Sequence, residues 1–404
     1  MPQSLAQLPT VTTYRRLFAI GQFRVLFLAR ACSMVGVVVG SLALGTVMYD
    51  ATDSPVLTAL AMFGGPMVQL ITSNFLLAAS DLLRPRTALV VTGSVAAIVD
   101  ALQLLPGLPW PARFGLVACV YVVSAATSGT AIALISDIVP TEAFVLGRAT
   151  MNITVGGIQV IGNGIGALLL LVVAPVHLFA ISAVALLAAV VVARIGLADH
   201  PPRARGPVAK RTRTVNRQLL RSPVIRPVLL MNWIPNGLIV GCEALYIPYA
   251  HGRAGYLFAA TAAGMLTGDI VMGRFVTERF RQRTVVHLRL LLAAPFLLLA
   301  FRPPVPIAAL LGVVAAFGYT GSLALQERLI QGVATDIKGQ TFGLAGAGLA
   351  VGQAVGALLA GTVGQLIGPA NGMTAMAVLS IAATCAIAPG LRRSNPQVRR
   401  SPTR

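Results

Sequence analysis

Charged side chains are scarce in this sequence, because Asp, Glu, Lys and Arg together make up 11% of its 404 residues. Hydrophobic residues make up 56%, and the mean hydropathy is +0.81. Soluble globular domains have about 25% charged residues, so the composition excludes an ordinary soluble protein. Most of the chain is expected to be surrounded by lipid.

Several functional classes are excluded by motifs that the sequence lacks. It has no G-x-x-x-x-G-K-[ST] loop for ATP, and its four histidines do not have metal-ligand spacing. A G-x-G-x-x-A pattern at residues 162–167 lies between two long apolar runs, without the strand and the acid that a dinucleotide site requires. No constellation around a catalytic nucleophile is present. We therefore expect neither an enzyme nor a bound cofactor or metal.

Long apolar runs recur along the chain, bounded by charges or by Pro and Gly. A transmembrane helix needs about 20 apolar residues, and twelve runs of that kind fit the apolar fraction. The predicted spans are residues 23–49, 55–79, 87–105, 113–136, 150–173, 176–194, 226–248, 255–276, 285–301, 305–326, 341–363 and 372–390. The sequence predicts an all-α integral membrane protein with twelve transmembrane helices.

One long polar segment, residues 195–225, divides these spans into two sets of six. It contains seven basic residues against the single acid Asp199, and its prolines discourage a continuous helix. We interpret it as a basic cytoplasmic linker between an N-terminal bundle, residues 1–194, and a C-terminal bundle with a basic tail, residues 226–404. Alternatively, its bases bind anionic lipid headgroups, each adding about 1 kcal/mol.

The basic residues are concentrated in alternate loops. A net charge of +19 would suggest nucleic-acid binding in a soluble protein, but here the predicted outer loops hold only Arg113, Arg253 and Arg302. This asymmetry follows the positive-inside rule and predicts that both termini are cytoplasmic. All but two of the 31 basic residues are arginines, which is typical of a high-GC bacterial genome. We expect a bacterial inner-membrane protein without a nucleic-acid partner.

The two halves of the chain repeat one another. Asp-Leu-Leu-Arg-Pro-Arg-Thr begins at Asp81 and Glu-Arg-Phe-Arg-Gln-Arg-Thr at Glu278, each between two apolar runs. The small-residue segment from Gly162 recurs from Gly352, each in the fifth span of its half. Equal order and an even span count imply two pseudo-symmetric six-helix bundles, related by a two-fold axis along the membrane normal.

Residues 23 to 390 resemble the major facilitator superfamily. The loop at Asp81 matches in part the family signature Gly-x-x-x-Asp-Arg-x-Gly-Arg-Arg, in its acid and in its final base, Arg86. The other segments that carry the resemblance are F-R-V-L-F-L-A-R at 23–30, Y-D-A-T-D-S-P at 49–55, D-I-V-P at 137–140, G-R-A at 147–149 and K-G-Q-T-F-G at 338–343. The first two of these look like the drug-exporter-like branches, and the resemblance implies a secondary transporter.

We call the two charged segments that begin at Asp81 and Glu278 the first and second hairpin. Their charges are predicted to form a gate at the cytoplasmic side. A short turn holds its carboxylate at the membrane surface, where it can face a helix N-terminus and pair with arginines. The resemblance implies that Asp81 latches the outward-open state against helix 11, with Arg148 nearby. Alternatively, the charges only prevent helices from sliding through the membrane. The predicted gate residues are Asp81, Arg84, Arg86, Arg148, Glu278, Arg279, Arg281 and Arg283.

Ionisable residues inside spans are costly and commonly functional. We assign Arg30, Asp100, Glu243 and Asp269 to this class. Glu243 can bind a proton or a cationic substrate, and Asp269 can exchange a proton or pair with Arg30. The alternatives are a structural ion pair for Asp269 and a position at the wet outer rim for Glu243.

Neutral polar side chains on the presumed inner helices predict a substrate cavity, for which we assign Ser33, Thr127, Asn232, Trp233, Asn236 and Tyr319. A largely apolar site with a few hydrogen-bonding groups and one acid suits an amphipathic organic molecule. Alternatively, such residues satisfy backbone carbonyls and allow close helix packing.

These features predict a monomeric carrier in the lipid bilayer that exports a small amphipathic drug or metabolite by alternating access. Because no ATP site is found, proton antiport is the expected driving force. Two alternatives remain open: proton-coupled or facilitated uptake of a small nutrient, and a transport-inactive membrane sensor or scaffold.

Overall fold

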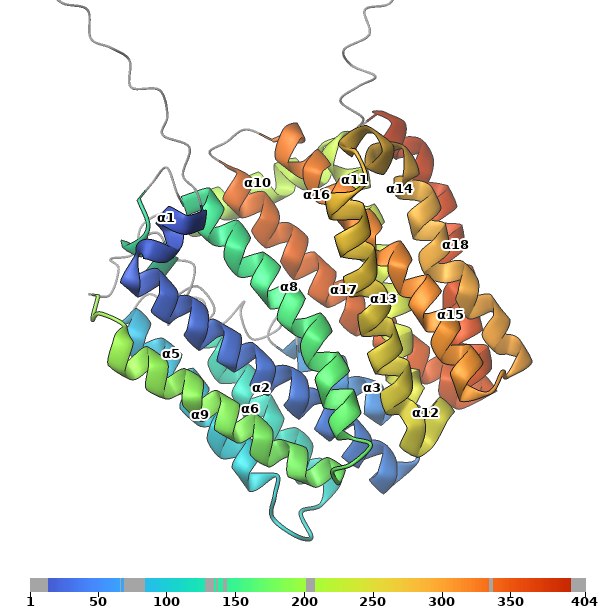
Figure 1. Ribbon diagram of the computed structural model, residues 1–404, viewed down its shortest axis with the longest axis horizontal. Helices are drawn as coiled ribbons and strands as arrows, with labels where there is room; N and C mark the ends of the chain where they lie inside the picture. The colour runs from blue at the N-terminus through green and yellow to red at the C-terminus, as the bar shows by residue number, and fades with distance from the viewer. Residues whose placement is uncertain are drawn as a thin grey trace, which may run out of the picture.

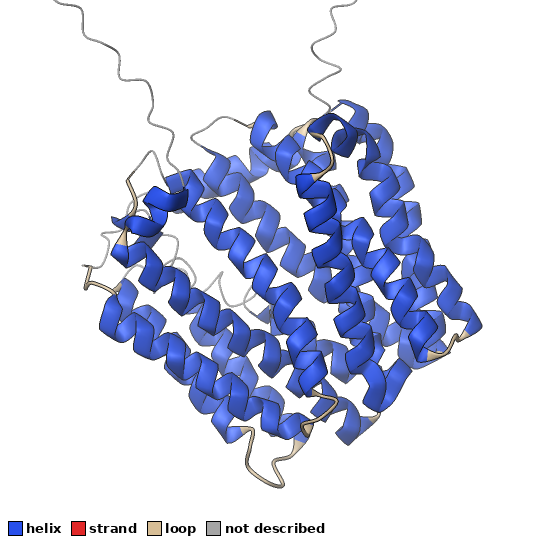
Figure 2. Ribbon diagram, in the orientation of Figure 1, coloured by secondary structure: helices blue, strands red, loops and turns tan. Residues whose placement is uncertain are grey.

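The computed structural model describes residues 14–65, 67–68, 84–127, 134–135, 137–140, 144–200, 208–333 and 337–393. In these ranges the regular structure is entirely helical (Figure 2). The helices run alongside one another between an upper edge of Figure 1, where α1 and α10 lie, and a lower edge, where α12 lies. The upper edge is the side predicted to be cytoplasmic, and we call the two edges inner and outer.

The described part of the N-terminal half begins with the short helix α1 and then contains six longer helices and one 3-10 turn. They are α1 (Tyr14–Ala19), α2 (Gly21–Thr52), α3 (Pro55–Phe63), α5 (Pro85–Leu102), α6 (Trp110–Thr127), α8 (Phe144–Leu169), η2 (Pro175–His177) and α9 (Leu178–Gly196). Within this half, α9 packs between α2 and α5, and α5 also contacts α6.

The C-terminal half has more interruptions. The helix α10 (Val208–Arg221) precedes it in the chain. The described elements of this half are α11 (Ile225–Gly241), η3 (Cys242–Leu245), α12 (Tyr246–Ala250), η4 (His251–Arg253), α13 (Ala254–Arg274), α14 (Glu278–Ala293), η5 (Ala294–Phe301), α15 (Val305–Phe317), η6 (Gly318–Thr320), α16 (Gly321–Gly332), α17 (Lys338–Ile367) and α18 (Pro369–Arg393). Here α11 packs against α17 and α18, and α13 packs against α15.

The described residues contain eight stretches that are long and apolar enough to cross a membrane. One of them, residues 225–272, covers two of the predicted spans. Each of the twelve predicted ranges contains described helix, although α3 represents only the first part of the range 55–79. The chain is therefore a multi-pass membrane protein, and twelve crossings stay a prediction.

The polar segment between the halves contains the helix α10, which begins directly after Pro207 and ends before Pro223. Val215 and Leu219 of this helix are buried against Ile225 and Leu325 of the C-terminal half. Arg217 and Arg221 remain exposed. The segment is thus not a freely solvated tether over its whole length, because an amphipathic helix buries its apolar face.

Two helix pairs form the most extensive described contacts between the halves: α8 packs along α13, and α3 packs along α17. At the outer end the hydroxyl of Ser54 lies 3.1 Å from Gln365 Oε1, within hydrogen-bond distance. Ser54 also caps α3 by accepting a hydrogen bond from the amide of Leu57 at 3.3 Å, and Pro55 follows it as the first helical residue. A Cβ at Gly361 would lie only 2.9 Å from the Pro55 carbonyl oxygen, so glycine permits this close approach.

The same helices contact each other less toward the inner edge. A Cβ at Gly164 of α8 would lie 3.3 Å from the Ala262 Cβ of α13, whereas one at Gly157, two turns closer to the inner edge, meets no described atom within 4 Å. The same is true at Gly346, near the inner end of α17. The described contacts between the halves therefore gather at the outer side, as in a carrier that is closed outside.

Two membrane helices are interrupted close to predicted site residues. After α11, which contains Pro235, the chain tightens into η3, and this turn carries Glu243. Between α15 and α16 the turn η6 carries Tyr319. Short 3-10 segments inside a helix are common at hinges and functional sites.

The closest helix packing in the C-terminal half joins α11 to α17. A Cβ at Gly356 would lie 2.1 Å from the Gly237 carbonyl oxygen. No side chain fits at such a distance, so the two backbones are in direct contact, as small residues allow in membranes.

Replacing Gly356 by Ala should therefore destabilise the protein by about 1–3 kcal/mol, the usual cost of overpacking. Gly346→Ala, on the same helix but facing open space, should be neutral or slightly stabilising, because Ala has the higher helix propensity. Thermal unfolding of the purified protein in detergent measures both. Equal melting temperatures for the two variants would contradict the described packing.

Candidate functional site

The N-terminal half presents a polar stripe on α2. Arg30, Ser33, Val37 and Ser41 follow one another at spacings of three or four residues, and each is at least partly accessible. Arg30 is the exposed basic residue of this stripe. It has no hydrogen-bond or ion-pair partner among the described residues, so the hypothesised pair with Asp269 is not formed here.

Asp100 of α5 lies at a junction of three helices. The Ser182 hydroxyl of α9 is hydrogen-bonded to the Asp100 carboxyl group and lies 2.7 Å from the Gly36 carbonyl oxygen of α2. A hydroxyl group has a single proton and cannot donate fully to both oxygens. A protonated Asp100 would resolve this conflict by donating to Ser182, which would then donate to Gly36.

The C-terminal half contains a cluster of polar groups that we call the C-terminal polar centre, formed by Asn232, Glu243, Asp269, Arg289, Tyr319 and Ser322. Its middle is Arg289 of α14, which has no exposed surface. Its Nη2 donates to Asn232 Oδ1 at 3.1 Å and to the Ser322 hydroxyl at 2.9 Å. The guanidinium group thus connects α14 to α11 and α16.

Arg289 is only partly satisfied by these contacts. Its Nε and Nη1 are buried and have no hydrogen-bond partner in the described part of the chain. Both contacts that it does make are with neutral groups, so no described ion pair balances its charge. A buried charge of this kind is costly unless another group compensates it.

Two carboxyl groups belong to the same centre. Glu243 in η3 is buried, with 7% of its surface exposed, and Asp269 of α13 is half-buried. Neither has a hydrogen-bond or ion-pair partner among the described residues. Tyr319 interacts electrostatically with both carboxyl groups and with Arg289. Opposite charges therefore share one region of the bundle without being directly paired.

Two other predicted cavity residues line the contact between α11 and α17. Trp233 is half-buried and donates from Nε1 to the Ala345 carbonyl oxygen at 2.9 Å. Asn236 is fully buried and accepts a hydrogen bond from Gln353 at 3.3 Å, while its Nδ2 has no partner within the described residues. The side chain of the remaining candidate, Thr127, lies outside the described residues.

The first hairpin is described only in part. Asp81 lies outside the described residues, and the side chain of Arg148 is likewise not described, although its backbone belongs to α8. Arg84 forms an exposed ion pair with Asp199 inside the N-terminal half. Arg86 is half-buried, and its Nε has no partner within the described ranges. The gate at this hairpin stays a prediction.

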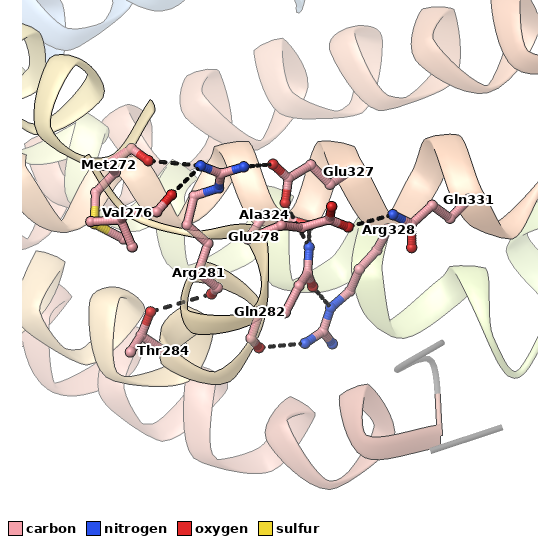
Figure 3. A network of polar contacts seen from close by, with 10 residues as sticks. All are labelled: Met272, Val276, Glu278, Arg281, Gln282, Thr284, Ala324, Glu327, Arg328 and Gln331. Carbon is pink, nitrogen blue, oxygen red and sulfur yellow. Dashed lines mark hydrogen bonds and ion pairs between the residues drawn. The ribbon is translucent and has the colours of Figure 1, made fainter. Parts of the chain in front are cut away.

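The second hairpin is held within its own half (Figure 3). Glu278 accepts a hydrogen bond from Gln331 of α16 at 2.7 Å. Arg281 donates to the carbonyl oxygens of Met272 at 2.9 Å and Val276 at 2.7 Å, at the end of α13 and just beyond it, and forms an ion pair with Glu327 at 2.5 Å. Exposed on the same helix, Arg279 and Arg283 have no partner among the described residues.

A buried network continues from this hairpin. Gln282 donates to the Ala324 carbonyl oxygen at 3.0 Å and to Glu327 at 2.8 Å. Arg328 donates to Gln282 Oε1 at 2.6 Å and to the Leu391 carbonyl oxygen of α18 at 3.1 Å. Figure 3 shows the contact between Gln282 and Arg328. Together with the contact to Leu391 it joins α14, α16 and α18 at their inner ends, so this hairpin braces the C-terminal half.

Several residues of these sites were not singled out in the sequence, among them Arg289, Gln282 and Arg328. The predicted ninth span begins at residue 285, which places Arg289 near the headgroups. Because α14 begins at Glu278, Arg289 instead lies about 16 Å along the helix. Its charge inside an apolar run was the available signal. Gln282 and Arg328 have no comparable signal, because polar residues at span ends are ordinary.

Residues 244–404 match the sequence model of the Major Facilitator Superfamily. A solved POT family transporter in complex with 5-aminolevulinic acid superposes with a TM-score of 0.70 at 12% identity, over 92% of this chain and 96% of that one. The chain has the major facilitator fold. A search of curated protein sequences finds no match.

Two further structures have the same fold. A bacterial homologue of the human lysosomal transporter Spinster, inward-facing and occupied, superposes with a TM-score of 0.69 at 13% identity, over 97% of this chain and all 100% of that one. The human organic anion transporter MFSD10 gives a TM-score of 0.59 at 18% identity, over 91% and 99% of the two chains. The major facilitator match is to transporters rather than enzymes, and these neighbours do not distinguish a drug-exporter branch.

The junction at Asp100 generates a stability prediction. Asp100→Ala should lower the free energy of unfolding by about 1–3 kcal/mol, because Ser182 loses a buried partner. Asp100→Asn should stay close to the unchanged protein, since its amide can donate to Ser182 as a protonated carboxyl group does. Thermal unfolding in detergent measures both, and an Asn variant as unstable as the Ala variant would contradict the assigned hydrogen bonds.

Proposed function

We propose that the protein is a secondary active transporter that exports a small amphipathic organic molecule by alternating access and proton antiport. The observation that carries this proposal is the C-terminal polar centre, in which Glu243, Asp269 and Arg289 come from three different membrane helices. The proposed location is a bacterial inner membrane with both termini cytoplasmic. The proposed active form is a monomer.

The distribution of contacts between the halves supports alternating access. Described contacts at the outer side, including Ser54 with Gln365, close that side, whereas Gly157 and Gly346 face open space toward the inner side. Rocking of the two bundles would exchange these arrangements. In the opposite state Asp81 is proposed to latch the inner side, as the family resemblance implies.

The polar centre supports proton coupling. A carboxyl group inside the bilayer requires either a proton or a cationic partner. Glu243 and Asp269 have no such partner among the described residues, while Arg289, which like them interacts with Tyr319, keeps two nitrogen atoms without a described partner. Release of a proton from either acid would create a partner for Arg289. Proton movement would thereby change which helices are tied together.

The surrounding side chains support an amphipathic substrate. Trp233 and Tyr319 provide aromatic surface, and Asn236 retains an unbonded amide nitrogen. Arg30 offers a cation to an acidic group of the substrate, and Glu243 offers a carboxyl group to a basic one. A few such groups in an apolar setting fix the orientation of an organic molecule.

The direct test uses everted membrane vesicles with a proton gradient reported by ACMA fluorescence. Amphipathic compounds, with ethidium as the first cationic probe, are added one at a time, and a substrate should dissipate the gradient. Glu243→Gln and Asp269→Asn should reduce this signal roughly tenfold or more, because neither amide can release a proton. Asp53→Asn, at an exposed outer turn, is the matched control.

An unaltered signal in both neutralised variants, with a clear response in the unchanged protein, would exclude the assigned coupling groups. Substrate movement in the same direction as the protons, instead of in exchange for them, would support the uptake alternative. If no compound dissipates the proton gradient and none binds to the purified protein, the sensor or scaffold alternative would be favoured.

A second experiment tests Arg289 as the alternating partner of Asp269. Arg289→Gln should reduce proton-driven transport roughly tenfold or more. If the two charges pair during the cycle, Arg289→Gln combined with Asp269→Asn should lose less than the sum of the single effects, with a coupling energy of about 0.5–3 kcal/mol. Additive losses in this double-mutant cycle would contradict the pairing.

A further inference from the structure

A groove of about 660 Å³ lies at the inner edge of the N-terminal half, where α2 begins and α9 ends. Its walls are apolar and include Val25, Leu28 and Val192, and its polar lining is Gln22 and Arg24. Leu28 is half exposed although it is a large apolar side chain. The groove thus combines a polar end with an apolar wall that continues one turn deeper along α2.

The groove has a fixed shape, because hydrogen bonds hold the two helices together beside it. Gln22 donates from Nε2 to the Gly196 carbonyl oxygen at 3.0 Å and accepts the Ala198 amide at 2.8 Å. A Cβ at Gly196 would lie 2.6 Å from the Val25 side chain, so the end of α9 is in direct contact with α2. The side chain of Gln22 is therefore already hydrogen-bonded, whereas Arg24, the other polar residue of the groove, has no hydrogen-bond partner among the described residues.

The charge around the groove is positive. Arg24 is exposed and has no hydrogen-bond or ion-pair partner among the described residues. Arg15 and Arg16 on the adjoining helix α1 are exposed and likewise have no described partner. The neighbouring acid, Asp199, is already paired with Arg84. Arg24 thus lines the groove as a cation without a described partner, Arg15 and Arg16 add positive charge on the helix that precedes it, and Asp199 is not available to neutralise them.

We propose that this groove binds an anionic phospholipid of the inner leaflet. The phosphate would contact Arg24, with Arg15 and Arg16 adding attraction, and one acyl chain would lie along Val25, Leu28 and Val192. A free phosphate or a soluble anion would use only the charged end, whereas a lipid also covers the exposed apolar wall. Basic residues at the membrane surface attract anionic lipids. The proposal depends on the cytoplasmic placement of this edge and not on the transport function.

Native mass spectrometry of the full chain, released from mixed nanodiscs, tests the proposal. With equal amounts of dioleoylphosphatidylglycerol and dioleoylphosphatidylcholine, the retained lipid should be mainly phosphatidylglycerol. Arg24→Gln should reduce its retention about fivefold, which corresponds to about 1 kcal/mol for one base near an anionic surface. Leu28→Ser should also reduce retention, since it removes part of the apolar wall.

Arg226→Gln is the matched control, because Arg226 is exposed in the first turn of α11, the opening helix of the other half. It should retain phosphatidylglycerol normally, and Arg24→Lys should retain most of it. A melting temperature for each variant separates lost binding from lost folding. Equal retention in Arg24→Gln and Arg226→Gln would overturn the proposal. So would equal retention of both lipids, or full competition by soluble glycerol phosphate.

Discussion

The unbalanced charge of Arg289 is the constraint around which the C-terminal half is arranged. An arginine cannot lose its proton in a protein, so its charge persists inside the bilayer and must be stabilised by dipoles or by a carboxylate. Asn232 and Ser322 supply dipoles from two other helices, and the breaks at η3 and η6 bring Glu243 and Tyr319 into the same region. Because the stabilisation is incomplete, the centre can change partners at low cost.

Motion between the halves follows from where each half is rigid. The network of Arg281, Gln282 and Arg328 joins the inner ends of α14, α16 and α18. Such fully connected polar networks rigidify the elements that they join. Between the halves, by contrast, contact is concentrated at the outer ends of the helices. Movement of one bundle against the other therefore costs fewer interactions than deformation inside a bundle.

The helical, multi-pass membrane character was predictable from the sequence because lipid imposes a strong composition and a minimum length on each helix. Rare polar residues in apolar runs also identified Glu243, Asp269, Asn232 and Tyr319, which the structure brings into one centre. Their mutual placement was not predictable, since it depends on the helix breaks after Gly241 and Phe317. Arg289 was missed because the predicted ninth span begins at residue 285, after the start of α14. The helix α10 was missed because the prolines of the polar segment lie outside this helix and do not interrupt it.

The third predicted span of each half contains a buried or half-buried ionisable residue, and the two residues differ in how far they are satisfied. In α5 the acid Asp100 is hydrogen-bonded to Ser182, which also contacts the backbone of a third helix. In α14 the base Arg289 keeps two buried nitrogen atoms without a described partner. A satisfied polar group stabilises one arrangement of helices, whereas an unsatisfied one gains by finding a partner in another arrangement. The difference between these two residues is therefore the reason why the proposed coupling is assigned to the C-terminal half.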